Sequence, residues 1–287
     1  MIDTVAVIVC AYSPDRWEPL QEAVASLRGQ SFDGEVRVGI VIDGDEQLCE
    51  LATDEYNSDG DVFVYCNNGS VGVSTSRNNG VEQLDSDVDV VAFMDDDAVA
   101  RPDWIAQLVE TYEETDTVAV GGRMVAEWVE REPRFLPEEH YWLIGVNGRD
   151  LAEPGEEVRN TFASNMSFRY NVFRELGGFA DSIGRRDDAN LQGEEPELGA
   201  RLRAEYGHGM VYNPDAVVAH KIFPYRLEFR WLVDRAFWQG YSKRAIDSLT
   251  FETSADAESS FLRYLLIKAA PRRLWELVRE PSVTAAG

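Results

Sequence analysis

Lysine, cysteine and long apolar runs are all scarce in this sequence of 287 residues. Lysine occurs only at Lys221, Lys243 and Lys268, so arginine supplies most of the 27 basic side chains, against 52 acidic ones and a formal net charge of −25. An acidic surface keeps a protein soluble at high salt, and the composition therefore predicts a salt-rich cytoplasm. A body this negative repels a phosphate backbone, which argues against nucleic acid as a partner.

The few cysteines follow no recognisable pattern. Cys10, Cys49 and Cys66 form neither an even framework nor a CxxC pair, and each lies in an apolar or mixed segment. We expect three small buried thiols and, from them, a reducing compartment.

No apolar run approaches the roughly 18 residues that a membrane-spanning helix needs. The first residues lack a basic n-region and lead directly into a strand-like run, so we expect a cytoplasmic protein. The length and the 44% hydrophobic content suit one large α/β domain with an appendage.

Three apolar, β-branched runs predict strands that are buried on both faces: Thr4–Tyr12, Glu35–Asp43 and Val88–Asp95. Arg16–Gln30 lies between the first two and has Leu20, Val24 and Leu27 at helical spacing, and Val73–Ser86 lies between the later two. Strand and helix therefore alternate, which predicts a Rossmann-like α/β sheet flanked by helices.

Polar residues follow each predicted strand, at the edge where open α/β sheets bind ligands. The strand ends are Ala11-Tyr12-Ser13, Asp43-Gly44-Asp45 and Asp95-Asp96-Asp97, and a Gly- and Asn-rich turn with Arg77 separates the two acidic ones. This pattern indicates a cleft for a ligand with hydrogen-bonding edges and a diphosphate, bridged to the carboxylates by Mg²⁺ or Mn²⁺. A solvated acidic loop is the alternative, and the aspartates alone leave both open.

Eight motifs follow one another in a fixed order: VIVCAY, Gln30-Ser31, IVIDG, NNGSVGVSTSRNNG, FMDDDA, NTFASNMSFRYNVFRELGGFAD, GEEPELGARLRAEYG and AVVAHK. In this order they resemble the family 2 glycosyltransferases, which are inverting enzymes with the type A nucleotide-sugar fold. The resemblance covers roughly Val5 to Lys221. It implies a mixed Rossmann-like sheet and a nucleotide-sugar-dependent catalytic domain over residues 1–225.

The resemblance also implies the donor site. By position, Asp43 and Arg77 correspond to residues that contact the nucleotide base, and the backbone near Ala11 and Tyr12 corresponds to the wall beside it.

The metal site follows from the DxD motif of the family. Asp95 corresponds to the carboxylate near the ribose or sugar, Asp97 to the metal ligand, and Asp96 lies between them. His220 corresponds to a histidine that completes the metal or diphosphate contacts, although alone it reads as a structural histidine at a strand end. Lys221 either helps to neutralise the diphosphate or faces solvent.

An inverting transfer needs a base within about 3 Å of the acceptor hydroxyl. In the family this base is the second acid of a Glu-Asp pair, and here Glu195 stands in its place, preceded by Glu194. Either glutamate can serve, because glutamate is one methylene longer than aspartate. Pro196 suits an early helical position, so capping of a helix is the alternative role for both acids.

The acceptor side is less defined. Asn165 corresponds to a family segment that meets donor or acceptor, and a structural turn is its alternative role. We expect Ala126–Asn160 to be a mobile acceptor loop. Arg185 and Arg186 either meet an acidic sugar or lipid phosphate or are ordinary surface residues.

The last segment, residues 226–287, changes character, with ten Lys and Arg against eight Asp and Glu. Its aromatic, aliphatic and basic residues predict amphipathic helices. For the first helical segment, packing on the catalytic domain and contact with a membrane surface both remain open, and for the second we expect membrane contact. The chain is thus expected to be peripheral at the cytoplasmic face of the cell membrane.

Together these observations predict a metal-dependent transferase of haloarchaeal lipid-linked glycan assembly. It would move a hexose or hexuronic acid from a UDP-linked donor to a sugar on polyprenyl or dolichyl phosphate. A synthase acting directly on the lipid phosphate and an inactive nucleotide-sugar-binding relative are the alternatives. A nucleotidyltransferase is disfavoured, because no Gly-rich, Arg-bearing phosphate loop follows the first strand.

Overall fold

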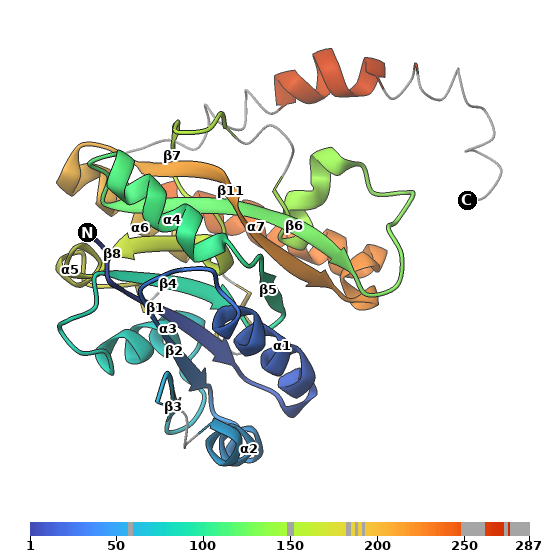
Figure 1. Cartoon of the computed structure of the whole chain (residues 1–287). Helices are drawn as coiled ribbons and strands as arrows, with labels where there is room; N and C mark the ends of the chain where they lie inside the picture. The colour runs from blue at the N-terminus through green and yellow to red at the C-terminus, as the bar shows by residue number, and fades with distance from the viewer. Residues whose placement is uncertain are drawn as a thin grey trace.

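The computed structural model describes residues 1–56, 60–147, 152–181, 185–186, 189–190, 193–247, 262–272 and 275. In this part of the chain a mixed sheet of nine strands forms the centre of the molecule (Figure 1). Its strands are β1 (Thr4–Ala11), β2 (Glu35–Ile42), β3 (Val62–Cys66), β4 (Val90–Asp95), β5 (Ala98–Ala100), β6 (Ala119–Trp128), β7 (Glu157–Val158), β8 (Met166–Arg169) and β11 (Met210–Ile222). They lie in the order β3-β2-β1-β4-β8-β6-β11-β5, and β7 pairs with β11. A separate pair joins β9 (Arg185–Arg186) and β10 (Ala189–Asn190).

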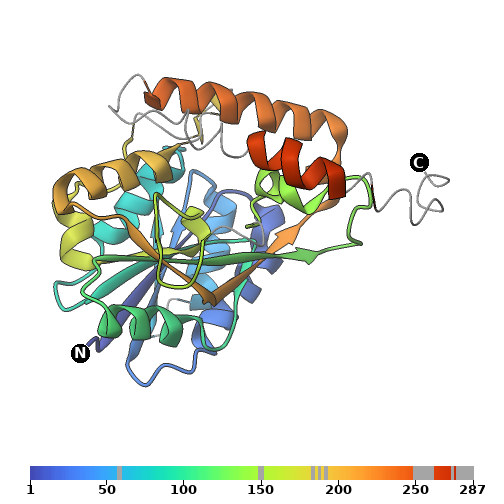
Figure 2. The same ribbon diagram turned by 90° about the horizontal axis from the view of Figure 1, so that it is seen from above.

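Helices cover both faces of the sheet. The α-helices are α1 (Trp17–Arg28), α2 (Glu46–Tyr56), α3 (Val73–Glu82), α4 (Trp104–Glu114), α5 (Tyr170–Glu175), α6 (Glu194–Tyr206) and α7 (Phe229–Asp247). Short 3-10 helices are η1 (Pro14–Arg16), η2 (Glu138–Ile144), η3 (Ala163–Asn165) and η4 (Pro224–Leu227), and η5 (Leu265–Ala269) is π-helical. Figure 2 shows α4, in green, on one side of the sheet and α6 and α7, in gold and orange, on the other.

Strand β1 shows why helices cover both faces of the sheet. Val5, Val7 and Val9 pack into one core with residues of α1, α2 and α4, whereas Ala6 and Ile8 pack into a second core with residues of α3, α5 and α6. Successive side chains of a strand point to opposite faces, so an uninterrupted apolar run is buried on both. The prediction of doubly buried strands is confirmed.

The direction of the strands places all three predicted strand ends together. β1 pairs in parallel with β2 on one side and with β4 on the other, so their carboxyl ends meet at one edge of the sheet. β8 runs antiparallel to β4 and β6, which makes the sheet mixed, as expected.

Two expectations about loops need correction. The Gly- and Asn-rich stretch is a turn only before Val73, where α3 begins, so Arg77 lies on a helix. The expected acceptor loop Ala126–Asn160 begins inside β6 and contains η2, whose Tyr141 and Ile144 are buried in a local apolar core. Apolar residues of η2, within this acidic segment, pack against α7.

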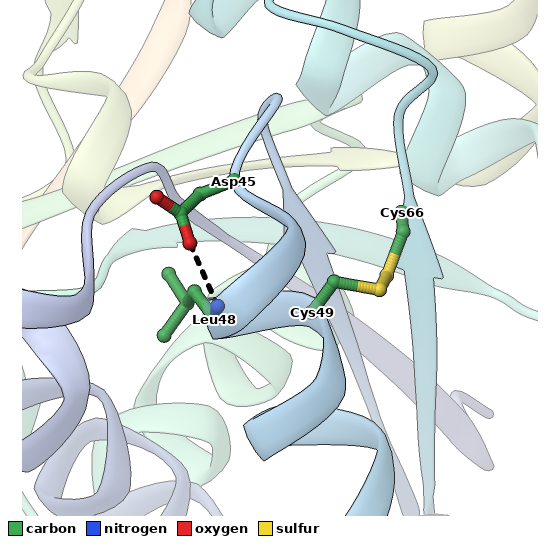
Figure 3. Close-up of a disulfide and its surroundings, with 4 residues drawn as sticks. All are labelled: Asp45, Leu48, Cys49 and Cys66. Atoms are coloured by element: carbon green, nitrogen blue, oxygen red, sulfur yellow. Dashed lines mark hydrogen bonds between the residues drawn. A yellow bond between two sulfur atoms is a disulfide. The ribbon is translucent and has the colours of Figure 1, made fainter.

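The expectation of three free thiols is wrong. Cys49 of α2 and Cys66 at the end of β3 form a disulfide (Figure 3), while Cys10 is a free thiol whose pKa burial raises to about 12. The β2–α2–β3 crossover brings the two cysteines together across 17 positions, which their spacing in the sequence does not reveal. The disulfide removes the basis for inferring a reducing compartment from cysteine usage. Asp45 caps α2 beside it, since its Oδ1 accepts a hydrogen bond from the backbone N–H of Leu48 at 2.7 Å.

The basic final segment is helical where the structure describes it, in η4, α7 and residues 262–272. The rest of the expected appendage, residues 248–261 and most residues beyond 272, lies outside the described part, as do the side chains of Arg185 and Arg186. Among the described helices none is both long enough and apolar enough to cross a membrane.

The disulfide closes a loop between residues 17 positions apart, and such a loop loses entropy in the unfolded chain. We predict that the double substitution Cys49→Ser/Cys66→Ser lowers the free energy of unfolding by about 3 kcal/mol. Denaturant unfolding at high salt measures this. Reductant should destabilise the parent protein by a similar amount and leave the double variant unchanged; equal stability of both proteins under oxidising conditions would contradict the prediction.

Candidate active site

The edge where β1, β2 and β4 end gathers the first group of candidate residues. The backbone N–H of Asp43 donates to the carbonyl of Ala11 at 2.8 Å, which joins the ends of β1 and β2. The carboxylate of Asp43 accepts hydrogen bonds from the backbone N–H groups of Val71 at 2.7 Å and Gly72 at 3.0 Å. Asp43 therefore holds the loop before α3 in place. The neighbouring Tyr12 side chain is exposed.

Arg77 connects this edge to the glutamate pair. Its buried guanidinium donates to Oδ1 of Asp95 at 3.0 Å and places Nη1 3.7 Å from Oε1 of Glu194. The ring of Phe179 lies 5.3 Å away and supports the guanidinium through a cation–π contact. Nη1 is buried and has no hydrogen-bond partner among the described residues, so Arg77 retains a donor for a ligand.

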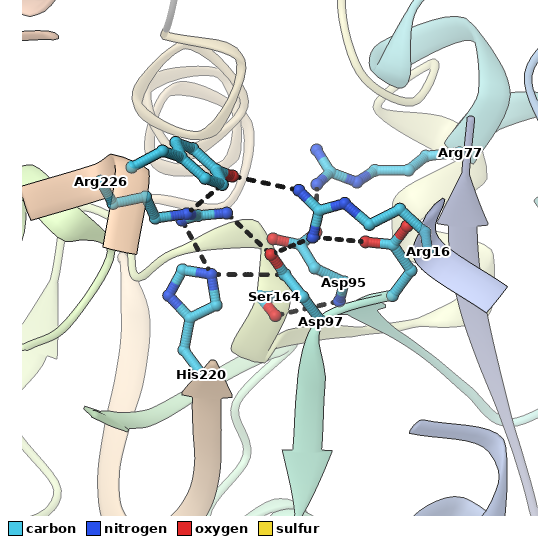
Figure 4. Close-up of polar contacts among 9 residues, drawn as sticks. Arg16, Arg77, Asp95, Asp97, Ser164, His220 and Arg226 are labelled. Atoms are coloured by element: carbon cyan, nitrogen blue, oxygen red, sulfur yellow. Dashed lines mark hydrogen bonds and ion pairs between the residues drawn. The ribbon is translucent and has the colours of Figure 1, made fainter. Parts of the chain in front are cut away.

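Asp97 is the most heavily paired carboxylate of the site (Figure 4). Its side chain is 2% exposed, and its Oδ2 lies 2.5 Å from Nη1 of Arg16 and 2.7 Å from Nη2 of Arg226. Oδ1 lies 3.3 Å from Nε2 of His220. Burial alone would raise the pKa of Asp97, but His220, Arg226 and Arg16 together outweigh burial and hold this pKa well below its usual range.

Asp95, Asp97 and His220 can hold a metal ion, since one ligand atom from each lies within 4.8 Å of the others. Carboxylate oxygens with one imidazole nitrogen suit Mn²⁺ or Mg²⁺. The ring nitrogen of His220 that faces the carboxylates is Nε2, which lies 3.3 Å from Oδ1 of Asp97 and 3.0 Å from Nη1 of Arg226. Gly145 makes room for this ring: its φ is +82°, and a Cβ there would lie 2.7 Å from Cε1 of His220.

Two neighbours of this group, Asp96 and Lys221, are also buried. Asp96 is buried with its Oδ2 unpaired among the described residues, and burial together with the Asp97 carboxylate raises its pKa well above the usual range. Lys221 neither faces solvent nor is free to meet a diphosphate, because its buried ammonium pairs with Glu22 of α1.

The glutamate pair opens α6, as the sequence indicated. Oε2 of Glu194 accepts from the backbone N–H of Gly193 at 3.0 Å, and Oε1 of Glu195 accepts from the backbone N–H of Ala163 at 3.3 Å. Burial and the neighbouring Glu194 carboxylate raise the pKa of Glu195 to about 7. A carboxyl group with this pKa can accept a proton near neutral pH, which is the property that a general base requires.

Asn165 lies in the core. Its amide is fully buried, with Nδ2 donating to the carbonyls of Arg123 at 3.0 Å and Ala216 at 2.9 Å. Its Oδ1 accepts from Nε1 of Trp104 at 2.8 Å. Both amide protons are thus committed to strands β6 and β11 and not to a turn, which gives Asn165 a role in the core, and the expected contact with donor or acceptor stays a prediction.

Three residues of the site escaped the sequence analysis. Arg16 and Arg226 hold Asp97, and Oγ of Ser164 accepts the backbone N–H of Asp95 at 3.0 Å. Arg16 lies five residues beyond the end of β1 and Arg226 four residues beyond the end of β11. Both arginines follow strands that end at this edge, which is the only signal in the sequence that marks them.

The mixed sheet between its layers of helices is the type A glycosyltransferase fold. Solved structures share it. S. aureus TarS 1-349 in complex with UDP-GlcNAc superposes with a TM-score of 0.57 at 16% identity, over 77% of this chain and 59% of that chain. GalNAc-T7 with UDP, GalNAc and Mn²⁺ superposes with a TM-score of 0.58 at 17% identity, over 77% of this chain and 44% of that chain.

The chain belongs to glycosyl transferase family 2, whose pattern matches residues 6–177. A Glucosyl-dolichyl phosphate glucuronosyltransferase of Haloferax volcanii is 44% identical over 97% of this chain and 88% of its own length. A Pre-mycofactocin glycosyltransferase of Mycobacterium tuberculosis is 28% identical over 77% of this chain, which spans 43% of that longer relative.

The core position of Asn165 leads to a stability prediction. Asn165→Ala leaves two buried carbonyls and an indole N–H without partners, so we expect the free energy of unfolding to fall by about 3 to 5 kcal/mol. Denaturant unfolding measures this, with Asn68→Ala, an exposed amide, as the control that should stay within about 0.5 kcal/mol of the parent. Unchanged stability with a raised KM would instead mark Asn165 as a ligand contact.

Proposed function

We propose that this protein is an inverting, metal-dependent glucuronosyltransferase that acts on a glucose carried by dolichyl phosphate. One observation carries the proposal: a group able to hold a divalent cation and a carboxyl group with a pKa near neutrality lie at the same edge of a type A sheet, joined by Arg77. The identity of the donor and acceptor rests on the relative of Haloferax volcanii. The strongly acidic composition supports a salt-rich cell.

The donor would bind along the strand ends. In this proposal the exposed ring of Tyr12 and the backbone at Ala11 form the wall for the base of a UDP-linked sugar, and Asp43 and Arg77 contact that base. Asp95, Asp97 and His220 would hold Mn²⁺ or Mg²⁺. Such an ion acts as a Lewis acid that neutralises a diphosphate leaving group.

Glu195 is the base in this proposal. It removes the proton from the acceptor hydroxyl as that oxygen bonds to the anomeric carbon, while the bond to the nucleoside diphosphate breaks. Direct displacement inverts the anomeric centre, so an α-linked donor gives a β-linked product. Glu194 keeps the pKa of Glu195 raised, and Arg77 lies beside Glu194, which leaves Glu195 as the proton acceptor.

The raised pKa of Glu195 also favours a sugar acceptor over a bare lipid phosphate. A phosphate oxygen is already ionised at neutral pH and needs no base, whereas a sugar hydroxyl must lose its proton during attack. A synthase acting directly on the lipid phosphate is therefore the second candidate. An inactive relative would have no use for a buried glutamate whose pKa is about 7.

A lipid-linked acceptor brings the enzyme to the surface of the membrane. We propose that the body stays at the cytoplasmic face, where nucleotide sugars are made, and that the final helices touch the lipid.

Replacing the base tests the mechanism. Glu195→Gln should lower kcat by about a thousandfold while donor binding persists, because the amide cannot accept the proton. In the parent enzyme kcat should rise as pH passes through about 7, since below this value Glu195 already carries a proton. Glu197→Gln on the same helix, which loses only a pair with Arg201, is the matched control. Undiminished turnover in Glu195→Gln would remove Glu195 from this role.

Donor binding tests the metal site separately. UDP-glucuronate with Mn²⁺ at a hundredfold excess over its Kd should raise the Tm by about 5 °C, and Asp97→Asn should abolish this shift. Differential scanning fluorimetry at high salt with a panel of nucleotide sugars measures it, and Asp103→Asn, an exposed neighbour, is the control. A shift that is independent of Mn²⁺ would contradict the assigned metal site.

A further inference from the structure

Helix α7 carries apolar side chains on two opposite faces, and the residues that the structure describes cover only one of them. Leu232 is buried in a local core with Tyr141 and Ile144 of η2, and Trp231 packs against the same core. An amphipathic helix has one apolar and one polar face, whereas α7 has a second apolar face.

The second face forms a stripe of four side chains along the helix, which we call the α7 stripe: Phe229, Val233, Phe237 and Tyr241. Residues four positions apart lie above one another on one face of a helix. Their side chains are 82%, 52%, 64% and 56% exposed, and the rings of Phe237 and Tyr241 stack with centroids 6.4 Å apart. A continuous row of exposed aromatic and aliphatic groups marks an interaction surface.

A second exposed apolar patch belongs to the same final segment. Leu262, Leu266 and Ile267 are exposed on the helix of residues 262–272, and Arg272 of that helix pairs with Glu139 of η2. η2 therefore supports both helices that present apolar groups to the outside.

We propose that the α7 stripe inserts into the headgroup region of a lipid bilayer and orients the active site toward the membrane surface. This inference rests on the proposed function, in which the acceptor carries a lipid. The α7 stripe begins at Phe229, three residues after Arg226, which pairs with Asp97. A bilayer that receives the α7 stripe thus lies next to the site, where a sugar on a membrane-embedded lipid phosphate can reach it.

Charge and composition favour a bilayer over a protein partner. The final segment from residue 226 has ten Lys and Arg against eight Asp and Glu, in a chain with a net charge of −25, so it is the part least repelled by anionic lipid. Exposed Arg230, Arg263 and Lys268 accompany the apolar groups, with Asp234 as an opposing charge. Aromatic side chains next to arginine and lysine are typical of helices that lie in the membrane interface.

Vesicle flotation at molar salt tests the proposal. The parent protein should float with phosphatidylglycerol vesicles, and the triple variant Phe229→Ser/Val233→Ser/Phe237→Ser should bind with a partition coefficient roughly a thousandfold lower, because each of the three large apolar side chains that leave water contributes about a factor of ten. Leu51→Ser, an exposed leucine on α2, is the matched control and should bind like the parent. Since the substituted side chains are exposed, the Tm should not change.

Three outcomes would overturn the proposal. In the first, the triple variant and the parent float equally. In the second, the parent does not float at all. In the third, neither protein floats, and light scattering shows a dimer for the parent and a monomer for the triple variant. This result would assign the α7 stripe to contact with a second copy of the chain.

The transferase assay keeps this inference separate from the proposed function. Turnover of a short-chain, water-soluble acceptor should be equal in the parent and the triple variant, whereas turnover of the same sugar on a vesicle-embedded lipid should fall at least tenfold in the variant. If no acceptor is glycosylated by either protein but only the parent floats, the proposed function fails and the membrane surface stands.

Discussion

A carboxylate removed from water must be neutralised by partners held in fixed positions, and Asp97 imposes this requirement on the whole site. Its partners come from separate parts of the chain: Arg16 from η1 after β1, His220 from β11, and Arg226 from η4. The backbone N–H of Lys221 also donates to the carbonyl of Asp97 at 2.8 Å. These contacts join the turn between β4 and β5 to the end of β11 and to η4.

Two acidic groups at this edge acquire opposite properties from their surroundings. Cationic partners hold the pKa of Asp97 well below its usual range, whereas burial and a second carboxylate raise that of Glu195 to about 7. One group is thereby a permanent anion and the other a proton acceptor near neutrality, a division that acid–base enzymes use repeatedly. Arg77 contacts Asp95 of the metal group and Glu194 of the glutamate pair. Its guanidinium therefore links the two groups by direct contact as well as by charge.

The acidic body and the final helices respond differently to salt. At molar ionic strength the Debye length is about 3 Å, so charges on the surface attract lipid headgroups only at contact. Burial of apolar groups does not weaken in the same way, and excluded salts strengthen it. In a salt-rich cell the α7 stripe, with Phe229 and Phe237 exposed, is thus better suited than a basic patch to hold the protein at a membrane.

The sequence by itself determined the local elements and much of the site. Uninterrupted apolar, β-branched runs predicted β1, β2 and β4, and the order of motifs singled out Asp95, Asp97, His220 and the glutamate pair, which the structure brings to one edge. Only the tertiary structure decided the disulfide between Cys49 and Cys66, the arginines on Asp97, the core role of Asn165 and the α7 stripe, which is exposed among the described residues. Periodicity and spacing report on neighbours along the chain, whereas these contacts depend on which distant segments the crossover connections bring together, and that geometry leaves no local pattern in the sequence.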